Sequence, residues 1–114
     1  MKADEIAHYL KEIQRVLAPG GRCLATFFIY NDANEDLIAT QDGFCFPVEG
    51  GRFRLMNEKV QSANIALHER YLDQIIDEAG LIKETLIEGY WKDSIEKQEG
   101  LDFQDVVVLA KAKE

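Results

Sequence analysis

The chain has 114 residues, of which 46% are hydrophobic and 30% charged, a composition typical of one globular domain rather than a disordered segment. Its 21 acidic and 13 basic side chains give a net charge of −8, which repels polyanions and argues against nucleic acid as a partner. No apolar run approaches the ~20 residues of a membrane-spanning helix, and the charged start lacks the apolar centre of a secretory signal, so we expect a cytoplasmic protein without a membrane partner.

The first predicted element is an amphipathic helix close to the N-terminus. Apolar side chains between Ile6 and Leu17 recur every three or four residues, which is the spacing of one helix face. Asp4 can accept hydrogen bonds from free amides of the first turn, whereas Pro19-Gly20-Gly21 cannot continue a helix. We therefore expect this helix to end near Ala18.

A nearly continuous apolar run at residues 22–30 follows the helix directly. The run is short, rich in β-favouring residues and bounded by turn residues, which predicts a central strand buried on both faces. A strand reached directly from a helix is typical of the second half of a β-α-β unit. The sequence thus indicates a parallel sheet, with the partner strand expected before residue 1.

Residues 31–67 show no regular hydrophobic period, and we expect them to form a lid or long inserted loop. Irregular insertions of this length are uncommon in compact domains and are often functional. Aromatic side chains in the segment argue against a disordered surface excursion. Its turn-forming and aromatic residues are Gly43, Phe44, Phe46, Pro47, Gly50, Gly51 and Phe53.

The last third of the chain predicts a helix and two strands. Apolar residues between Tyr71 and Ala79 have helical spacing, and Gly80 stands where a left-handed residue ends a helix. Residues 82–89 and 103–112 have the composition of strands. The polar connection between them is too short and too charged for a packed crossover helix, so we expect the two strands to be antiparallel neighbours.

Several of these segments resemble segments of a known protein family. The helix ending in YLKEIQRVLAPGG (residues 9–21), followed at once by a buried strand, resembles the segment before the fifth strand of class I S-adenosylmethionine-dependent methyltransferases. EAGL (78–81) before a strand, and the final antiparallel hairpin, resemble the C-terminal end of the same family. GYW (89–91) and FQDV (103–106) are similar to a small-molecule subgroup, from which Lys92-Asp93 departs.

The resemblance covers essentially the whole chain and implies its fold class. We expect a single α/β domain over residues 1–114, which forms part of a Rossmann-like methyltransferase sheet. Its three main strands, the last of them antiparallel, are accompanied by two principal helices and the lid at 31–67. The family binds its cofactor through a glycine-rich turn after the first strand and a nearby acidic residue, and this sequence contains no such segment.

The cofactor expectation follows from that difference. Gly20-Gly21 and Gly50-Gly51 are the glycine pairs of the sequence, and neither lies in a GxGxxG pattern between a strand and a helix, so a turn is the favoured interpretation. We expect the intact enzyme to use S-adenosylmethionine. We expect none to bind tightly to this chain alone, and we assign no cofactor-binding residue.

Candidate substrate-binding residues come from the end of the central strand and from the aromatic positions. Ligands bind outside the carboxyl ends of strands in open α/β sheets, and aromatic side chains with one polar anchor suit a small-molecule pocket. The aromatic residues could equally well hold the lid by packing. The candidates are Tyr30, Asn31, Phe44, Phe46, Arg52 and Trp91.

The remaining reactive side chains indicate no chemistry. His8 and His68 have no recognisable partner motif, so structural roles are favoured and no catalytic residue is assigned. Cys23 and Cys45 have no CxxC spacing and no neighbouring histidine cluster, which predicts reduced thiols and no metal site. The acids in residues 34–36 are expected in a solvated turn.

Three functional hypotheses remain open. The first is the substrate-side half of an S-adenosylmethionine-dependent methyltransferase that acts on a small molecule and is inactive alone. The second is a non-enzymatic domain that self-associates or binds a partner through an unpaired sheet edge, and the third is a truncated methyltransferase product without independent activity. Because strand 22–30 is expected to lack one neighbour, we predict a homodimer or pairing with an N-terminal methyltransferase half.

Overall fold

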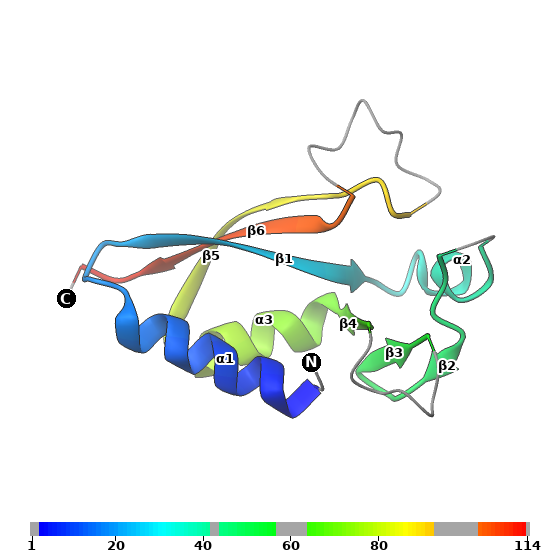
Figure 1. Cartoon of the computed structure of the whole chain (residues 1–114), viewed down its shortest axis with the longest axis horizontal. Helices are drawn as coiled ribbons and strands as arrows, with labels where there is room; N and C mark the ends of the chain where they lie inside the picture. Colours follow the sequence, from blue (N-terminus) through cyan, green and yellow to red (C-terminus); the bar gives the residue numbers. More distant parts are fainter. Residues whose placement is uncertain (1–2, 42–43, 57–63, 93–102, 114) are drawn as a thin grey trace.

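A computed structural model describes residues 3–41, 44–56, 64–92 and 103–113 of the chain. The protein is an α/β structure in which these residues form a six-stranded mixed sheet and three helices (Figure 1). The strands are arranged in the order β2-β3-β4-β1-β6-β5. In chain order the elements are α1 (Ala3–Val16), β1 (Arg22–Tyr30), α2 (Glu35–Thr40), β2 (Val48–Glu49), β3 (Phe53–Leu55), β4 (Ile65–His68), α3 (Glu69–Glu78), β5 (Leu81–Ile87) and β6 (Asp105–Lys111).

Strand β1 has two different neighbours along its length. Residues 22–27 pair antiparallel with β6, whereas residues 28–30 pair parallel with β4. On the far side of β6, β5 is also antiparallel to it. The prediction that the last two strands are antiparallel neighbours is therefore confirmed, and β6 lies between β1 and β5, which run in the same direction.

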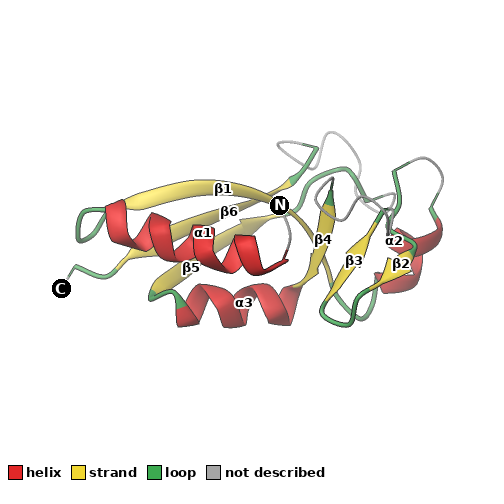
Figure 2. Cartoon of the chain, turned by 60° about the horizontal axis from the view of Figure 1, so that its bottom comes forward, coloured by secondary structure: helices red, strands yellow, loops and turns green. Residues whose placement is uncertain are grey.

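Helices α1 and α3 cover one face of this sheet (Figure 2). Every second residue of β1, including Phe27 and Ile29, packs against them in one hydrophobic core. Leu10 of α1 and Leu72 of α3 are fully buried there. The two helices predicted from helical spacing are thus confirmed, with α1 ending at Val16, two residues before the predicted end.

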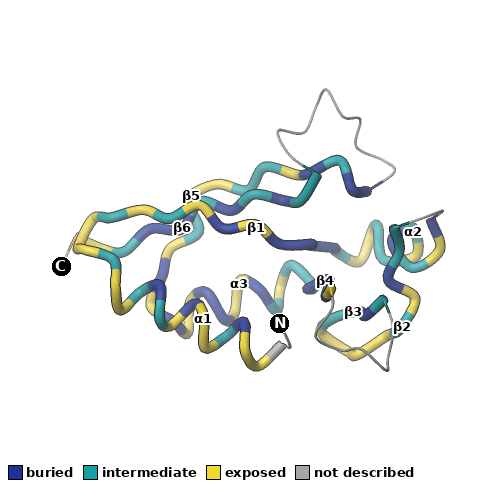
Figure 3. Tube along the Cα trace, viewed as in Figure 1, coloured by how far each residue is buried: buried dark blue, intermediate teal, exposed yellow. Residues whose placement is uncertain are grey.

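Among the described residues, the opposite face is covered only near the carboxyl end of β1. There Phe28 and Tyr30 pack with Phe46 and Trp91 in a second core. At the other end of the strand Leu24 is 72% exposed, and Figure 3 shows β1 changing from exposed to buried along its length. The expectation of a strand buried on both faces is therefore wrong for its first half, because no described segment covers that face.

The expected lid contains regular structure. Within 31–67 the chain forms α2 and the strands β2, β3 and β4, which pair antiparallel in succession and extend the sheet. Strand β4 lies beside the carboxyl end of β1, and β3, β2 and α2 lie beyond it (Figure 1). Part of the open edge expected beside β1 is thus occupied by β4. Gly43 and the polar connection at 93–102 lie outside the described residues.

Positive φ angles mark the ends of helices and the tight hairpin. Gly20 after α1 has a φ of 81° and Gly80 after α3 a φ of 80°, so the predicted left-handed residue at the end of the second helix is confirmed.

Two other features complete the description of the fold. Cys23 and Cys45 are free thiols. None of the helices in the described ranges combines the length and apolar character needed to cross a membrane.

Candidate functional site

A polar pocket lies where β1 and β4 end. The two strands are parallel neighbours, so their carboxyl ends meet at one edge of the sheet, and Tyr30 stands opposite His68 there. The pocket has a volume of about 300 Å³ and also receives side chains from α2, the β2–β3 hairpin and α3. Its ionisable lining residues are Asp32, Glu35, Glu49, Arg52, His68 and Arg70, with Tyr71 beside them.

The ends of β1 and β4 and the adjoining β2–β3 turn place one row of residues along this edge. The His68 backbone N–H donates to the Arg52 carbonyl oxygen at 3.0 Å, which sets these residues opposite each other. Residues opposite each other on neighbouring strands project from the same face. The Tyr30 and His68 rings meet edge to face, with centroids 5.1 Å apart. The structure thus brings two predicted site residues, Tyr30 and Arg52, to either side of His68.

Asp32 is held by two donors at the mouth of the pocket. Its Oδ1 lies 2.8 Å from His68 Nε2, and its Oδ2 accepts a hydrogen bond of 2.7 Å from Arg70 Nη2. The hydrogen bond from His68, with the Arg70 charge nearby, lowers the pKa of the Asp32 carboxyl below its usual 3.8. Asp32 is therefore an ionised acceptor near neutral pH and a weak base.

His68 uses both of its ring nitrogens. Its Nδ1 accepts a hydrogen bond from the Arg70 backbone N–H at 3.1 Å, which makes His68 the N-cap of α3. Because Nδ1 is an acceptor, the neutral ring carries its proton on Nε2 and donates it to Asp32. The cap is a structural role, as the sequence favoured, but the bond to Asp32 gives this histidine a partner that the sequence did not reveal.

A buried arginine, Arg54, pairs with the lining residue Glu35 but does not itself line the pocket. Arg54 donates from Nε to the Phe46 carbonyl at 2.8 Å and from Nη2 to the Pro47 carbonyl at 3.1 Å. Its Nη1 pairs with Glu35 Oε2 at 2.7 Å. The expected solvated turn at residues 34–36 is therefore wrong at Glu35, which lies in the first turn of α2 and anchors this arginine.

Tyr30, which is not among the residues that line the pocket, carries a buried hydroxyl. The residue is 1% exposed, and its Oη has no hydrogen-bond partner among the described residues. Burial, reinforced by the negative charge of Glu35, raises the pKa of Tyr30 to about 12. The phenol consequently stays protonated at neutral pH and can act only as a hydrogen-bonding group.

Asn31 closes the turn after β1. Its backbone N–H donates to Asn34 Oδ1 at 2.8 Å, and the Asn34 backbone N–H donates to Asn31 Oδ1 at 3.0 Å. This reciprocal pair fixes the chain between β1 and α2. Of the predicted residues, Asn31 is thus engaged in the turn and is not among the residues that line the pocket.

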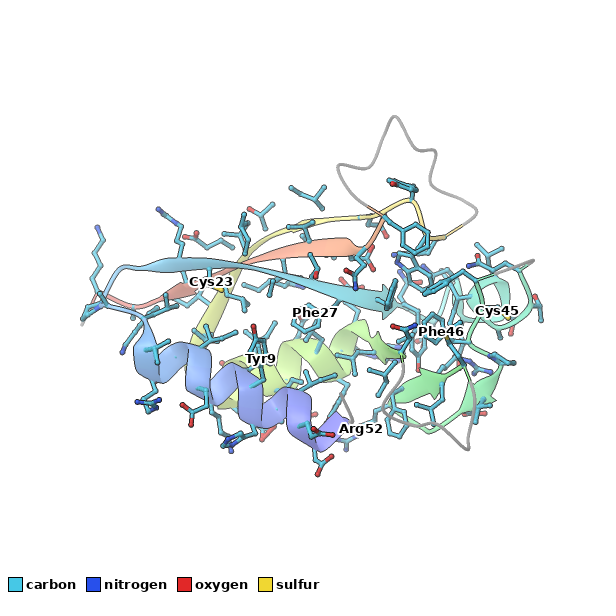
Figure 4. All side chains as sticks on the ribbon, viewed as in Figure 1. Tyr9, Cys23, Phe27, Cys45, Phe46 and Arg52 are labelled. Carbon is cyan, nitrogen blue, oxygen red and sulfur yellow. The ribbon has the colours of Figure 1, made fainter. Side chains whose placement is uncertain are left out.

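The aromatic candidates gather in the second core. Phe44 and Phe46 have ring centroids 5.4 Å apart, and Phe46 and Trp91 5.5 Å apart. Phe46 lies at the α2 end of the molecule, next to Cys45 (Figure 4). None of the three aromatics lines the polar pocket. Their contacts are those of packed side chains, and a role in binding stays a prediction.

A buried carboxylate outside the set of predicted site residues fixes this core. Asp105 is fully buried, and its oxygens accept hydrogen bonds from Ile29 N at 2.7 Å, Gly89 N at 2.8 Å and Trp91 Nε1 at 2.9 Å. Lys92 Nζ lies 3.4 Å from its Oδ1. The only signal in the sequence is an acid at the start of an otherwise apolar strand.

Comparison of the chain with known proteins identifies no family for it. No family model matches the sequence, and no solved structure matches the chain. Across the residues that the structure describes, no group of three or more His, Cys, Asp or Glu side chains is arranged to hold a metal ion. The functional assignment therefore rests on the fold and the pocket.

Proposed function

We propose that the chain is the substrate-side part of a cytoplasmic S-adenosylmethionine-dependent methyltransferase that acts on a small molecule. The observation that carries this proposal is the arrangement of β1, β6 and β5, in which the last strand is inserted antiparallel between two parallel ones. Both long helices lie on one face of these strands. This arrangement is the one expected from the resemblance of residues 9–21 and 78–81 to class I methyltransferases.

The polar pocket supports the same proposal. Open α/β sheets bind ligands outside the carboxyl ends of their strands, and the pocket lies at the ends of β1 and β4. Methyl transfer by in-line displacement depends mainly on positioning the acceptor and excluding water. A pocket of polar and charged groups held by mutual hydrogen bonds suits that task, although both nitrogens of His68 are engaged and no catalytic residue is assigned.

The described residues do not fit a site for the cofactor itself. Gly20 and Gly80 follow helices, and Gly51 lies in the β2–β3 hairpin, so no described glycine with positive φ lies in a turn from a strand to a helix. We therefore propose that S-adenosylmethionine is held mainly by another segment of the intact enzyme.

Calorimetry on two proteins tests the proposal. The first protein is the present chain, and the second is the chain fused to the polypeptide encoded directly upstream of it. We expect the fusion alone to bind S-adenosylmethionine at micromolar concentration and to transfer its labelled methyl group to a small-molecule acceptor. The proposal fails if the fusion neither binds the cofactor nor contains a glycine-rich turn between its first strand and helix.

A second candidate function is a non-enzymatic domain that self-associates. The observation in its favour is the first half of β1, where residues 22–27 have no described strand on the side away from β6. Exposed Leu24 lies in this stretch. An unpaired apolar strand edge recruits another strand. The two functions are compatible, because the open edge and the polar pocket lie at opposite ends of β1.

A further inference from the structure

Most of the charges around the polar pocket neutralise one another. Asp32 is bonded to His68 and Arg70, and Glu35 pairs with Arg54 behind the pocket wall. Two charged lining residues remain: within the described ranges the side chains of Glu49 and Arg52 form no ion pair and no hydrogen bond. Among the described residues, the wall of the pocket therefore presents one carboxylate and one guanidinium that have no ion pair and no hydrogen bond.

Both groups are attached to a fixed piece of backbone. Glu49 is paired with Arg54 across the β2–β3 hairpin, which the hydrogen bond of 2.8 Å from Gly50 N to the Phe53 carbonyl closes. Arg52 lies in the turn of this hairpin, and its carbonyl is bonded to His68 N. The two side chains thus start from known positions on one wall rather than from separate mobile loops.

An aromatic ring also orients the Arg52 guanidinium. The Cζ atom of Arg52 lies 5.6 Å from the centroid of the Tyr71 ring of α3, within the range of a cation–π contact. A guanidinium that is held through its face keeps its planar N–H edge available. That edge matches the two oxygens of a carboxylate.

We infer that the pocket binds a small zwitterion, with the ligand carboxylate on Arg52 and the ligand ammonium on Glu49. A singly charged molecule would pair with only one of these side chains and so gain one charge-assisted contact fewer than a ligand that carries both charges. A phosphate or another dianion would meet Asp32 and Glu49 in the same pocket. The identity of this ligand as the methyl acceptor rests on the proposed function, but its binding does not require the cofactor.

An NMR titration of the present chain at pH 7 tests the inference. The probes are glycine, β-alanine and γ-aminobutyrate, which separate the two charges by different lengths, with propionate and propylamine as singly charged comparators. We expect one of the zwitterions to bind at least about tenfold more tightly than either comparator. The amide signals of Arg52, His68 and Tyr71 should shift on binding.

Two variants assign the charges. Arg52→Gln should lower the affinity for the zwitterion to that for propylamine, and Glu49→Gln should lower it to that for propionate. Arg15→Gln is the matched control, because Arg15 is an exposed residue of α1 that pairs with Glu12 and does not line the pocket. It should leave every affinity unchanged.

The inference is overturned if all five probes bind alike, or if Arg15→Gln weakens binding as much as Arg52→Gln does. Failure of the fused enzyme to bind S-adenosylmethionine would contradict the proposed function and leave the zwitterion site standing. Loss of zwitterion preference in a fusion that does bind the cofactor would contradict the site alone.

Discussion

The buried carboxylate of Asp105 ties together β1, the turn after β5 and β6. Three N–H donors and the Lys92 ammonium surround its two oxygens. An amide in its place would direct an NH₂ group at some of these donors. We expect Asp105→Asn to lower the free energy of unfolding by about 3–5 kcal/mol, the usual cost of breaking a buried charged pair.

Urea denaturation of both proteins measures this difference. Asp77→Asn is the control, because Asp77 is an exposed residue of α3, and it should change the free energy of unfolding by less than about 0.5 kcal/mol. Equal stability of the two variants would show that the Asp105 hydrogen bonds contribute nothing net to the fold.

For the hydroxyl of Tyr30 we predict the opposite effect of removal on stability. It is buried without a partner among the described residues, so its removal costs no hydrogen bond and relieves a desolvated polar group. We expect Tyr30→Phe to be neutral or to stabilise the protein by up to about 1–3 kcal/mol in urea denaturation at pH 7. A clear loss of stability would mean that the hydroxyl has a bonding partner.

The same variant has a second readout in alkali. Because the pKa of Tyr30 is raised to about 12 in the folded protein, the unfolded chain loses this proton first as the pH rises. Below the ordinary tyrosine pKa of about 10 this ionisation does not affect the free energy of unfolding. Between there and pH 12 it lowers the free energy of unfolding progressively. Tyr30→Phe should show a smaller decline than the parent over this interval.

At the scale of elements, helix α3 depends on its histidine cap. His68 accepts the Arg70 N–H and also bonds Asp32, so His68→Ala removes both contacts. We expect a loss of about 0.5–2 kcal/mol in the free energy of unfolding, as for other N-caps. His8→Ala, on the exposed side of α1, should have little effect. Similar losses for the two variants would show that the cap is dispensable.

The long elements could be predicted because each has its own pattern. Helical spacing is a local feature of the sequence, and it is present both between Ile6 and Leu17 and between Tyr71 and Ala79. The short strands of the expected lid have no such pattern. Strand β4 has four residues, too few for a period to show, and it is fixed by its distant neighbour β1. The same holds for β2, where two residues depend on pairing with β3.

The candidate site could be predicted only in part, for a related reason. Tyr30 was expected at the site because the carboxyl end of a buried strand is a general location for ligands. The partner of His68 could not be found in this way, because Asp32 is 36 positions away in the sequence and is brought close by the pairing of β1 with β4. The sequence cannot distinguish a binding role from a packing role for the aromatic candidates, because a pocket wall and a packed core both favour Phe and Trp.

Among the described residues, the molecule leaves uncovered a part of one sheet face and the edge along the first half of β1. Opposite the helices, Leu24 stands beside Val108 of β6, and Ile82 of β5 is 51% exposed. The backbone groups of Cys23, Ala25 and Phe27 are directed at β6, as the hydrogen bond from Lys111 N to the Gly21 carbonyl indicates. The N–H and C=O groups of the alternate residues 22, 24 and 26 therefore point to the open edge.

A hollow of about 380 Å³ lies along this edge. Its walls include Ile6 and Tyr9 of α1 and residues 24–28 of β1. Figure 4 shows Tyr9 and Phe27 between β1 and the helices. An added strand would fill the hollow, satisfy the open backbone groups and cover apolar side chains, each worth about 1.5–3 kcal/mol when fully buried.

We propose that a second copy of the chain supplies this strand. Two-fold pairing of antiparallel β1 edges places Leu24 opposite Leu24 and Arg22 opposite Thr26, so apolar contact forms at the axis without like charges meeting. Light scattering coupled to size exclusion should give twice the chain mass of 13.0 kDa at tens of micromolar. Leu24→Lys brings two positive charges together at the axis and should yield a folded monomer, whereas Ile82→Lys, on the same face but away from the edge, should remain a dimer. A monomeric parent, or a Leu24→Lys variant that still dimerises, would rule out pairing through this edge.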